Sequence, residues 1–168
     1  ATYAAYLDPA LMHRVAVYCR ERGLYLQMYS NDEIVVEQVC EATLVDPDSR
    51  VTAVREIGDL TRAELEPSPK MMILDTPERL VTVRQELKAR FGEQLHLATS
   101  KDYLLEMMPQ GVSKRETLAR YAAEQGIRRE EAMVCGDNTN DVEMVAWAGL
   151  GVAVGNAVVS VDGAAIYT

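Results

Sequence analysis

The feature that most constrains the fold is a strand, helix and strand pattern near the end of the chain. The run "AMVC" (132–135) has the length of a short buried strand, "DVEMVAWAG" (141–149) has helical spacing, and "LGVAVG" (150–155) reads as a second buried strand. Short apolar strands that alternate with helices are typical of a parallel sheet covered on both faces. The sequence therefore predicts an α/β fold, with "IYT" (166–168) as a candidate third strand.

A capped helix precedes this pattern. Ser113 and Glu116 fit a capping box, which predicts a helix that begins at Lys114 and ends at the terminator Gly126. The proline and glycine of residues 109–111 are typical of a hinge. We therefore expect two domains, an α/β domain over residues 1–108 and a second domain over residues 109–168.

The first hundred residues also mix strands with helices. Two helices are predicted from N-cap residues followed by proline, at 9–22 and 77–91. Apolar runs bounded by turn residues predict five strands, at 24–30, 33–37, 70–74, 95–99 and 103–107. Residues 38–70 carry charges and three of the six prolines, and they have no clear period.

Charge and cysteine content exclude several classes of protein. The net charge of -9 over 168 residues argues against a nucleic-acid groove, because phosphate backbones are bound by clustered lysine and arginine. Cys19, Cys40 and Cys135 fit no zinc or disulfide spacing, which favours free thiols in a reducing compartment. The first twenty residues lack the pattern of a secretory signal. We expect a cytoplasmic protein.

One uncharged stretch, residues 144–161, has the length of a membrane span. Four of its residues are glycine or asparagine, many are alanine, and an aspartate-rich motif adjoins its start. A helix end followed by a buried strand explains the stretch better than a membrane span does. We therefore expect no membrane partner.

The motif "GDNTND" follows the predicted strand at 132–135. Ligands of open parallel sheets bind beyond the carboxyl ends of the strands, so Asp137 and Asp141 lie at the functional edge. Two converging carboxylates suit magnesium, which leaves positions for water and phosphate oxygens. A calcium loop of the EF-hand kind is excluded, because Val142 and Ala148 stand where its glycine and glutamate are required. The alternative is that both aspartates serve only as turn and cap residues.

Lys114 provides a second clue. It occupies the first turn of its predicted helix, where the helix dipole disfavours a cation. A bound phosphate would offset this cost, because free backbone N–H groups and the ammonium can bind the same anion. The alternative is a solvated surface lysine. Together, a metal site and an anion site indicate phosphoryl transfer or phosphate-ester hydrolysis.

The segment "GVSKRETLARYAAEQGIRREEAMVCGDNTNDVEMVAWAGLGVAVGNA" resembles the C-terminal part of the haloacid dehalogenase superfamily, specifically the Cof-type phosphatases. Lys114 matches the third signature of that family and "GDNTND" the fourth, while "LYLQMYSNDE" and "YLLEMMPQGVSK" resemble its α/β cap. The resemblance implies part of a Rossmann-like parallel-sheet core with a cap domain that closes over the site.

The resemblance also implies a mechanism, in which a strand-end aspartate attacks phosphate and forms an aspartyl-phosphate. By resemblance, Asp137 ligates Mg²⁺, and Asp141 ligates it or orients its waters. Asn140 hydrogen-bonds near the phosphate and Lys114 neutralises charge. Covalent attack by a carboxylate divides hydrolysis into two easier steps, which makes this set of roles chemically coherent.

The chain departs from the family in one large respect. No apolar strand leads into a D-x-D-G-T motif near its start. The only D-x-D is "VDPDSR", where Asp46 and Asp48 flank a proline in cap-like sequence, and this context predicts a loop rather than a nucleophile. We therefore expect this chain to be a fragment of a longer protein. The nucleophile of that protein would lie outside these residues, and this chain alone would be inactive.

The expected substrate is a small phosphorylated metabolite such as a sugar phosphate. Asn31 and Asp32, in the turn between the first two predicted strands, are candidate substrate contacts. A phosphosugar mutase and a non-catalytic scaffold protein are the alternatives. The oligomeric state is left open by the sequence.

Overall fold

The computed structural model describes residues 4–167, which form two compact units. The first unit runs to Leu97 and also includes Lys101–Gln110, and the second comprises Ala98–Ser100 and the chain from Gly111 onward. Each unit has a hydrophobic cluster of its own, so each is described separately.

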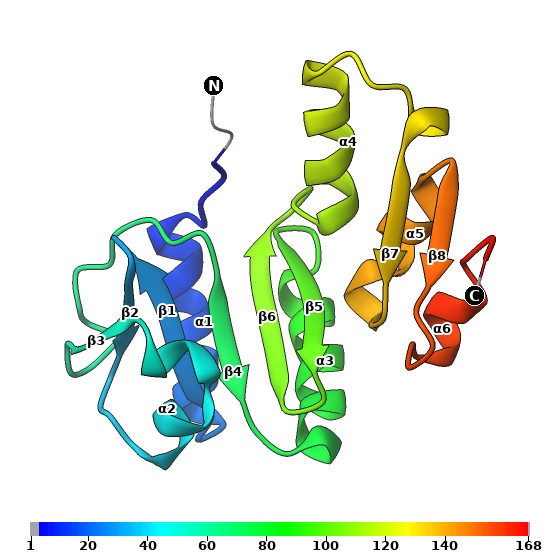
Figure 1. Ribbon diagram of the computed structural model, residues 1–168. Coiled ribbons are helices and arrows are strands. Elements are labelled where there is room, and N and C mark those ends of the chain that lie inside the picture. Colours follow the sequence, from blue (N-terminus) through cyan, green and yellow to red (C-terminus); the bar gives the residue numbers. More distant parts are fainter. Residues whose placement is uncertain (1–3, 168) are drawn as a thin grey trace. The chain divides into compact units, whose positions relative to one another are not determined.

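The first unit is built on a mixed sheet of six strands in the order β3-β2-β1-β4-β6-β5 (Figure 1). Strand β1 runs antiparallel to β2 and β4, and β4 runs antiparallel to β6, whereas β2 and β3 are parallel. The strands are β1 (Tyr25–Ser30), β2 (Glu33–Val36), β3 (Ala53–Glu56), β4 (Met71–Leu74), β5 (Leu95–Lys101) and β6 (Leu104–Pro109).

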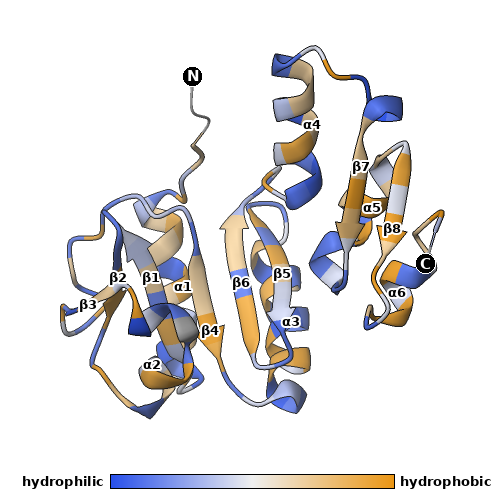
Figure 2. Cartoon of the chain, viewed as in Figure 1, coloured by the Kyte–Doolittle hydropathy of each residue, from blue (hydrophilic) through white to orange (hydrophobic). Residues whose placement is uncertain are grey.

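Two long helices, α1 (Pro9–Glu21) and α3 (Pro77–Phe91), cover one face of this sheet (Figure 1). Each begins as the sequence predicts, with Asp8 and Thr76 as N-caps that accept hydrogen bonds from the first turn. The apolar stripes of both helices pack on buried side chains of β4, which Figure 2 colours as hydrophobic along its whole length. This packing forms the larger of the two main cores.

The opposite face of the sheet carries α2 (Glu41–Val45) and the 3-10 helix η1 (Pro47–Arg50) (Figure 1). The sequence predicted no regular structure here, and the expectation that "VDPDSR" forms a loop was wrong in part. Asp46 ends α2 and caps η1, and its side chain is buried. The turn residues adopt helical geometry because they are fixed by side chains of β1, which are distant in sequence.

The second unit contains a parallel pair of strands, β7 (Met133–Gly136) and β8 (Leu150–Ala153), as the sequence predicts. Its helices are α4 (Lys114–Glu124), α5 (Val142–Trp147) and α6 (Val159–Asp162), with the 3-10 helices η2 (Arg129–Glu131) and η3 (Thr139–Asp141). The candidate strand at 166–168 is reduced to one bridge between Val152 and Tyr167, and Thr168 lies outside the described residues. The α/β prediction is confirmed.

The uncharged stretch at 144–161 is divided among α5, β8 and α6. Within residues 4–167, no helix combines the length and the apolar character that a membrane span requires.

The thiols of the first unit should differ sharply in reactivity. Cys19 lies in the core, and its burial raises the pKa of the thiol to about 12, whereas Cys40 is exposed. Because the thiolate is the reactive form, we expect a disulfide reagent near pH 8 to label Cys40 in the folded protein and Cys19 only after unfolding. Peptide mass spectrometry measures both rates. Labelling of Cys19 at the rate of Cys40 would contradict the buried placement.

Candidate functional site at the end of β7

The "GDNTND" motif leaves the sheet of the second unit at the carboxyl end of β7. The strand ends at Gly136, Asp137 is the next residue, and η3 begins two residues later. Two backbone hydrogen bonds fix this turn from the far side: Val154 N–H donates to Gly136 O over 3.2 Å, and Val158 N–H donates to Asp137 O over 2.9 Å. The turn is therefore held by the segment that follows β8.

Asp141 turns back on the loop that precedes it. Its Oδ2 accepts hydrogen bonds from the backbone N–H groups of Asp137, over 3.1 Å, and Asn138, over 3.2 Å. Its Oδ1 lies 2.5 Å from Lys114 Nζ. The residue is only 4% exposed, so this carboxylate is a buried anchor that links the loop to α4.

The environment of Asp141 keeps its carboxylate ionised. Burial alone would raise the pKa, but the hydrogen bonds from Lys114 and from the two backbone N–H groups outweigh it, and the pKa of Asp141 is lowered from its ordinary value. The charge on the carboxylate is thus available to hold the lysine in place.

Gly136 allows this close approach. A Cβ atom at this position would lie 2.6 Å from Asp141 Cβ and 2.8 Å from Val145 Cγ2. These distances are shorter than ordinary contacts, so a side chain at residue 136 would displace the anchor.

Lys114 is the first residue of α4, as predicted. Ser113 caps the helix by accepting a hydrogen bond from Glu116 N–H over 3.1 Å. The lysine side chain remains half exposed although it is paired with Asp141. An ammonium group therefore stands beside the positive end of a helix and remains accessible to an anion from solvent.

Two polar groups of the motif are left available. The Asp137 carboxylate is exposed and makes no hydrogen bond or ion pair within the described chain. Asn140 Oδ1 is buried and has no partner among the described residues. An accessible carboxylate and an orphaned amide oxygen three residues further along the motif are oxygen donors of the kind that Mg²⁺ prefers.

The donor set within residues 4–167 is incomplete for a metal held by protein alone, since no three His, Cys, Asp or Glu side chains of that part cluster together. Mg²⁺ commonly uses only one or two carboxylates and completes its shell with water and phosphate oxygens. The residues present fit such a site, with Asp137 as the available ligand. Asp141 already has both carboxylate oxygens engaged.

Asn31 and Asp32 belong to the first unit. They form the tight turn between β1 and β2, with φ angles of 49° and 62°, a geometry typical of hairpin turns. Asn31 Nδ2 donates a hydrogen bond to Glu66 Oε2 over 2.6 Å. The structure thus gives Asn31 a local role in the turn, and its contact with substrate stays a prediction.

Sequence reasoning missed the residues that support the loop from behind. Val154 and Val158 act through backbone N–H groups, so their side chains carry no chemical signal. The orphaned oxygen of Asn140 likewise results from tertiary packing, which leaves no pattern in the sequence.

The sequence profile of the haloacid dehalogenase-like hydrolases matches residues 1–168. The chain is 32% identical over 140 residues to a phosphoglycolate phosphatase of Methanoculleus marisnigri, covering 83% of this chain and 44% of that protein. It is 30% identical over 102 residues to an HMP-PP phosphatase of Serratia proteamaculans, covering 61% and 37% respectively. The chain thus spans less than half of the length of the curated relatives it matches.

Solved structures agree with this comparison. A haloacid dehalogenase-like hydrolase from Bacteroides thetaiotaomicron superposes with a TM-score of 0.83 at 30% identity, covering 99% of this chain and 63% of that one. Another, from Bacillus subtilis, has a TM-score of 0.84 at 20% identity and supports the fold alone. Sequence and fold lead to the same conclusion: the chain belongs to the haloacid dehalogenase-like hydrolase family.

Proposed function

We propose that the protein containing this chain is a Mg²⁺-dependent phosphatase of small phosphate monoesters such as sugar phosphates. The observation that carries the proposal is the arrangement at the end of β7, where the accessible Asp137 carboxylate adjoins the ion pair of the buried Asp141 and the half-exposed Lys114. Relatives named as phosphatases support the reaction class. A free thiol at each of the three cysteines is compatible with a cytoplasmic setting.

Each residue of the site has a chemical role in this proposal. Asp137 ligates the metal, which would supply charge stabilisation for the phosphate. Asp141 holds Lys114 and the loop in place, Lys114 neutralises charge on the phosphate, and Asn140 hydrogen-bonds close to it. Lys114 is held by Asp141 before substrate arrives, so little reorganisation of its charge is needed during the reaction.

The attacking carboxylate, in this proposal, comes from residues outside these 168 and forms an aspartyl-phosphate that water then hydrolyses. Residues 1–108 would serve as the cap domain, and residues 109–168 as the C-terminal half of the core. Asn31 and Asp32 remain candidate substrate contacts of the cap.

The reaction is tested by product analysis on the protein extended upstream of residue 1 along its gene. Sugar phosphates and p-nitrophenyl phosphate are incubated with Mg²⁺, and inorganic phosphate and isomeric sugar phosphates are quantified. We expect free phosphate to account for nearly all of the substrate consumed. Isomeric sugar phosphates without free phosphate would instead establish a mutase, and magnesium binding without any turnover would favour a scaffold protein.

The metal role of Asp137 gives a separate prediction. Asp137→Asn keeps the size of the side chain but removes its charge, so we expect the Mg²⁺ concentration for half-maximal activity to rise by about tenfold or more. Glu143→Gln removes a nearby charge on α5 and serves as the matched control. An unchanged magnesium requirement in Asp137→Asn would exclude the residue as a ligand.

A further inference from the structure

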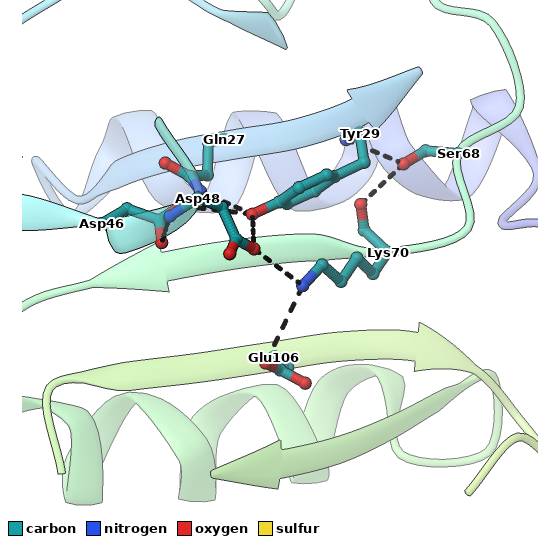
Figure 3. A network of polar contacts seen from close by, with 7 residues as sticks. All are labelled: Gln27, Tyr29, Asp46, Asp48, Ser68, Lys70 and Glu106. Carbon is teal, nitrogen blue, oxygen red and sulfur yellow. Dashed lines mark hydrogen bonds and ion pairs between the residues drawn. The ribbon is translucent and has the colours of Figure 1, made fainter. Parts of the chain in front are cut away.

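The segment between β2 and β3 crosses the sheet face that α1 and α3 leave open. We call residues 40–52 the strap; it contains α2, η1 and the turns around them. Figure 3 shows Asp46 and Asp48 of the strap reaching the side chains of β1.

The central attachment of the strap is the Asp46 carboxylate. Its Oδ2 accepts hydrogen bonds from Gln27 Nε2, over 2.5 Å, and from Tyr29 OH, over 3.2 Å. Its Oδ1 accepts from Asp48 N–H over 3.1 Å, which also starts η1. Gln27 is fully buried and Asp46 is 2% exposed, so one carboxylate joins the sheet to the strap in a site shielded from water.

The remaining attachments are also polar. Tyr25 OH donates to Thr43 Oγ1 over 2.8 Å, and Tyr29 OH lies 3.2 Å from Asp48 Oδ2. Lys70 Nζ lies 3.9 Å from Asp48 Oδ2 and 4.3 Å from the centre of the Tyr29 ring. Figure 3 shows Lys70 between the strap and Glu106, which it also approaches to 3.9 Å.

The strap's own apolar side chains contribute little to these attachments. The large apolar side chains of the strap point to solvent, with Leu44 64%, Val45 48% and Val51 87% exposed. The main core of the unit lies on the other side of the sheet, beneath α1 and α3. Loss of the strap would therefore remove hydrogen bonds but leave the main core intact.

The sheet face under the strap can be hydrated without leaving a polar group unsatisfied. If the strap moved away, Gln27 and Tyr29 would exchange Asp46 for water, and Lys70 would exchange Asp48 for water but keep Glu106. The same face also carries a small cluster of buried apolar side chains, made of Met72, Leu74 and Leu104. Opening the strap would therefore expose some apolar surface as well, which favours the closed state.

We propose that the strap is a lid that opens as one unit while the sheet stays folded, with the buried Asp46 carboxylate as its latch. Opening would uncover the polar side chains of β1 and remove one wall, formed by Ala42 and Val45 of α2, from a pocket of about 500 Å³ that Tyr25, Leu74 and Tyr103 also line. The strap thus controls access to a ligand-sized space in the first unit. This device is independent of the proposed phosphatase activity.

Hydrogen exchange of the wild-type protein, followed by mass spectrometry, tests the cooperative opening. The backbone N–H groups of Thr43, Ser49, Val51 and Thr52 are hydrogen-bonded within the strap. We expect peptides covering 40–52 to exchange together, at least about tenfold faster than those covering β1 and β4. Equal protection of the strap and the two central strands would overturn the proposal.

The latch is tested with Asp46→Asn. One oxygen of an asparagine cannot accept from both Gln27 and the Asp48 N–H, so a buried donor loses its partner in the closed state. Because hydrogen bonds to a carboxylate are strong, we expect strap exchange to accelerate roughly 10- to 100-fold with β4 unchanged. Glu41→Gln, which removes an exposed charge from the same strap, should leave the rate within about twofold.

A milder variant and a second readout keep this test decisive. Tyr29→Phe retains the ring beside Lys70 but removes the hydroxyl bond to Asp46, and a smaller acceleration is expected. Tryptic cleavage after the exposed Arg50 should also accelerate, more in Asp46→Asn than in Tyr29→Phe, because the cleavage rate follows the population of the open state. Strap exchange and cleavage that are unchanged in both variants would show that Asp46 is no latch.

Discussion

Replacing Lys114 by alanine is expected to lower kcat/KM for phosphate release by about 100-fold or more. The ammonium lies 2.5 Å from Asp141 Oδ1 and remains half exposed at the start of α4. Its loss removes a charge that stabilises the phosphate most strongly as charge moves in the transition state, an effect that typically accounts for two or three orders of magnitude. Steady-state kinetics of the extended protein, with saturating Mg²⁺, measure the change.

The control for this variant is Lys88→Ala, which removes one exposed charge from the last turn of α3. We expect its activity within about twofold of the wild type, as for most surface substitutions. An equal loss in both variants would point to long-range electrostatics. Full activity of Lys114→Ala would remove the lysine from the mechanism.

Gly136→Ala is expected to destabilise the second unit by about 1–3 kcal/mol, the usual cost of overpacking. The new Cβ would meet Asp141 Cβ at 2.6 Å and Val145 Cγ2 at 2.8 Å, in a part of the chain fixed by β7, η3 and α5. Displacement of Asp141 should also weaken the hold on Lys114, so activity falls together with stability. Urea unfolding followed by the fluorescence of Trp147, the single tryptophan, reports on this unit.

Gly155→Ala is the matched control, because a Cβ at residue 155 would meet no atom within 4 Å. The same glycine-to-alanine change should leave the unfolding midpoint nearly unchanged there. If Gly136→Ala unfolds like Gly155→Ala, the tight packing of Asp141 against the strand end is contradicted.

The helices that sequence predicted best are those whose signals are local. Pro77–Phe91 was predicted with its correct bounds, because Thr76 caps it and a proline stands at its first position. The start of α4 at Lys114 was also correct, since Ser113 supplies the cap. Both helix starts depend on residues within four positions of each other.

The strap shows why other elements could not be predicted. Its helices α2 and η1 are too short for an apolar period, and Leu44 and Val45 point to solvent. They are fixed through Asp46, which lies between them and bonds Gln27 and Tyr29, residues 19 and 17 positions earlier in the chain. Side-chain contacts over such distances leave no periodic pattern in the sequence.

The candidate site was accessible to sequence reasoning where strand order fixes geometry. The position of Asp137 after β7 and the proximity of Lys114 to Asp141 follow from the way parallel strands end at one edge. The different roles of Asp137 and Asp141 could not be predicted from strand order. They depend on which carboxylate is engaged, and the structure shows Asp141 bonded to Lys114 and to the loop backbone, whereas Asp137 is accessible.

The most direct test of the central claim compares this 168-residue chain with the protein extended upstream along its gene, in one assay of Mg²⁺-dependent phosphate release from sugar phosphates. We predict turnover by the extended protein, its loss on chelation of Mg²⁺ and in Asp137→Asn, and no turnover by the 168 residues alone. Robust turnover by the 168 residues that Asp137→Asn abolishes would contradict the proposed external nucleophile. Magnesium-independent turnover by the extended protein would contradict the proposed role of the "GDNTND" loop itself.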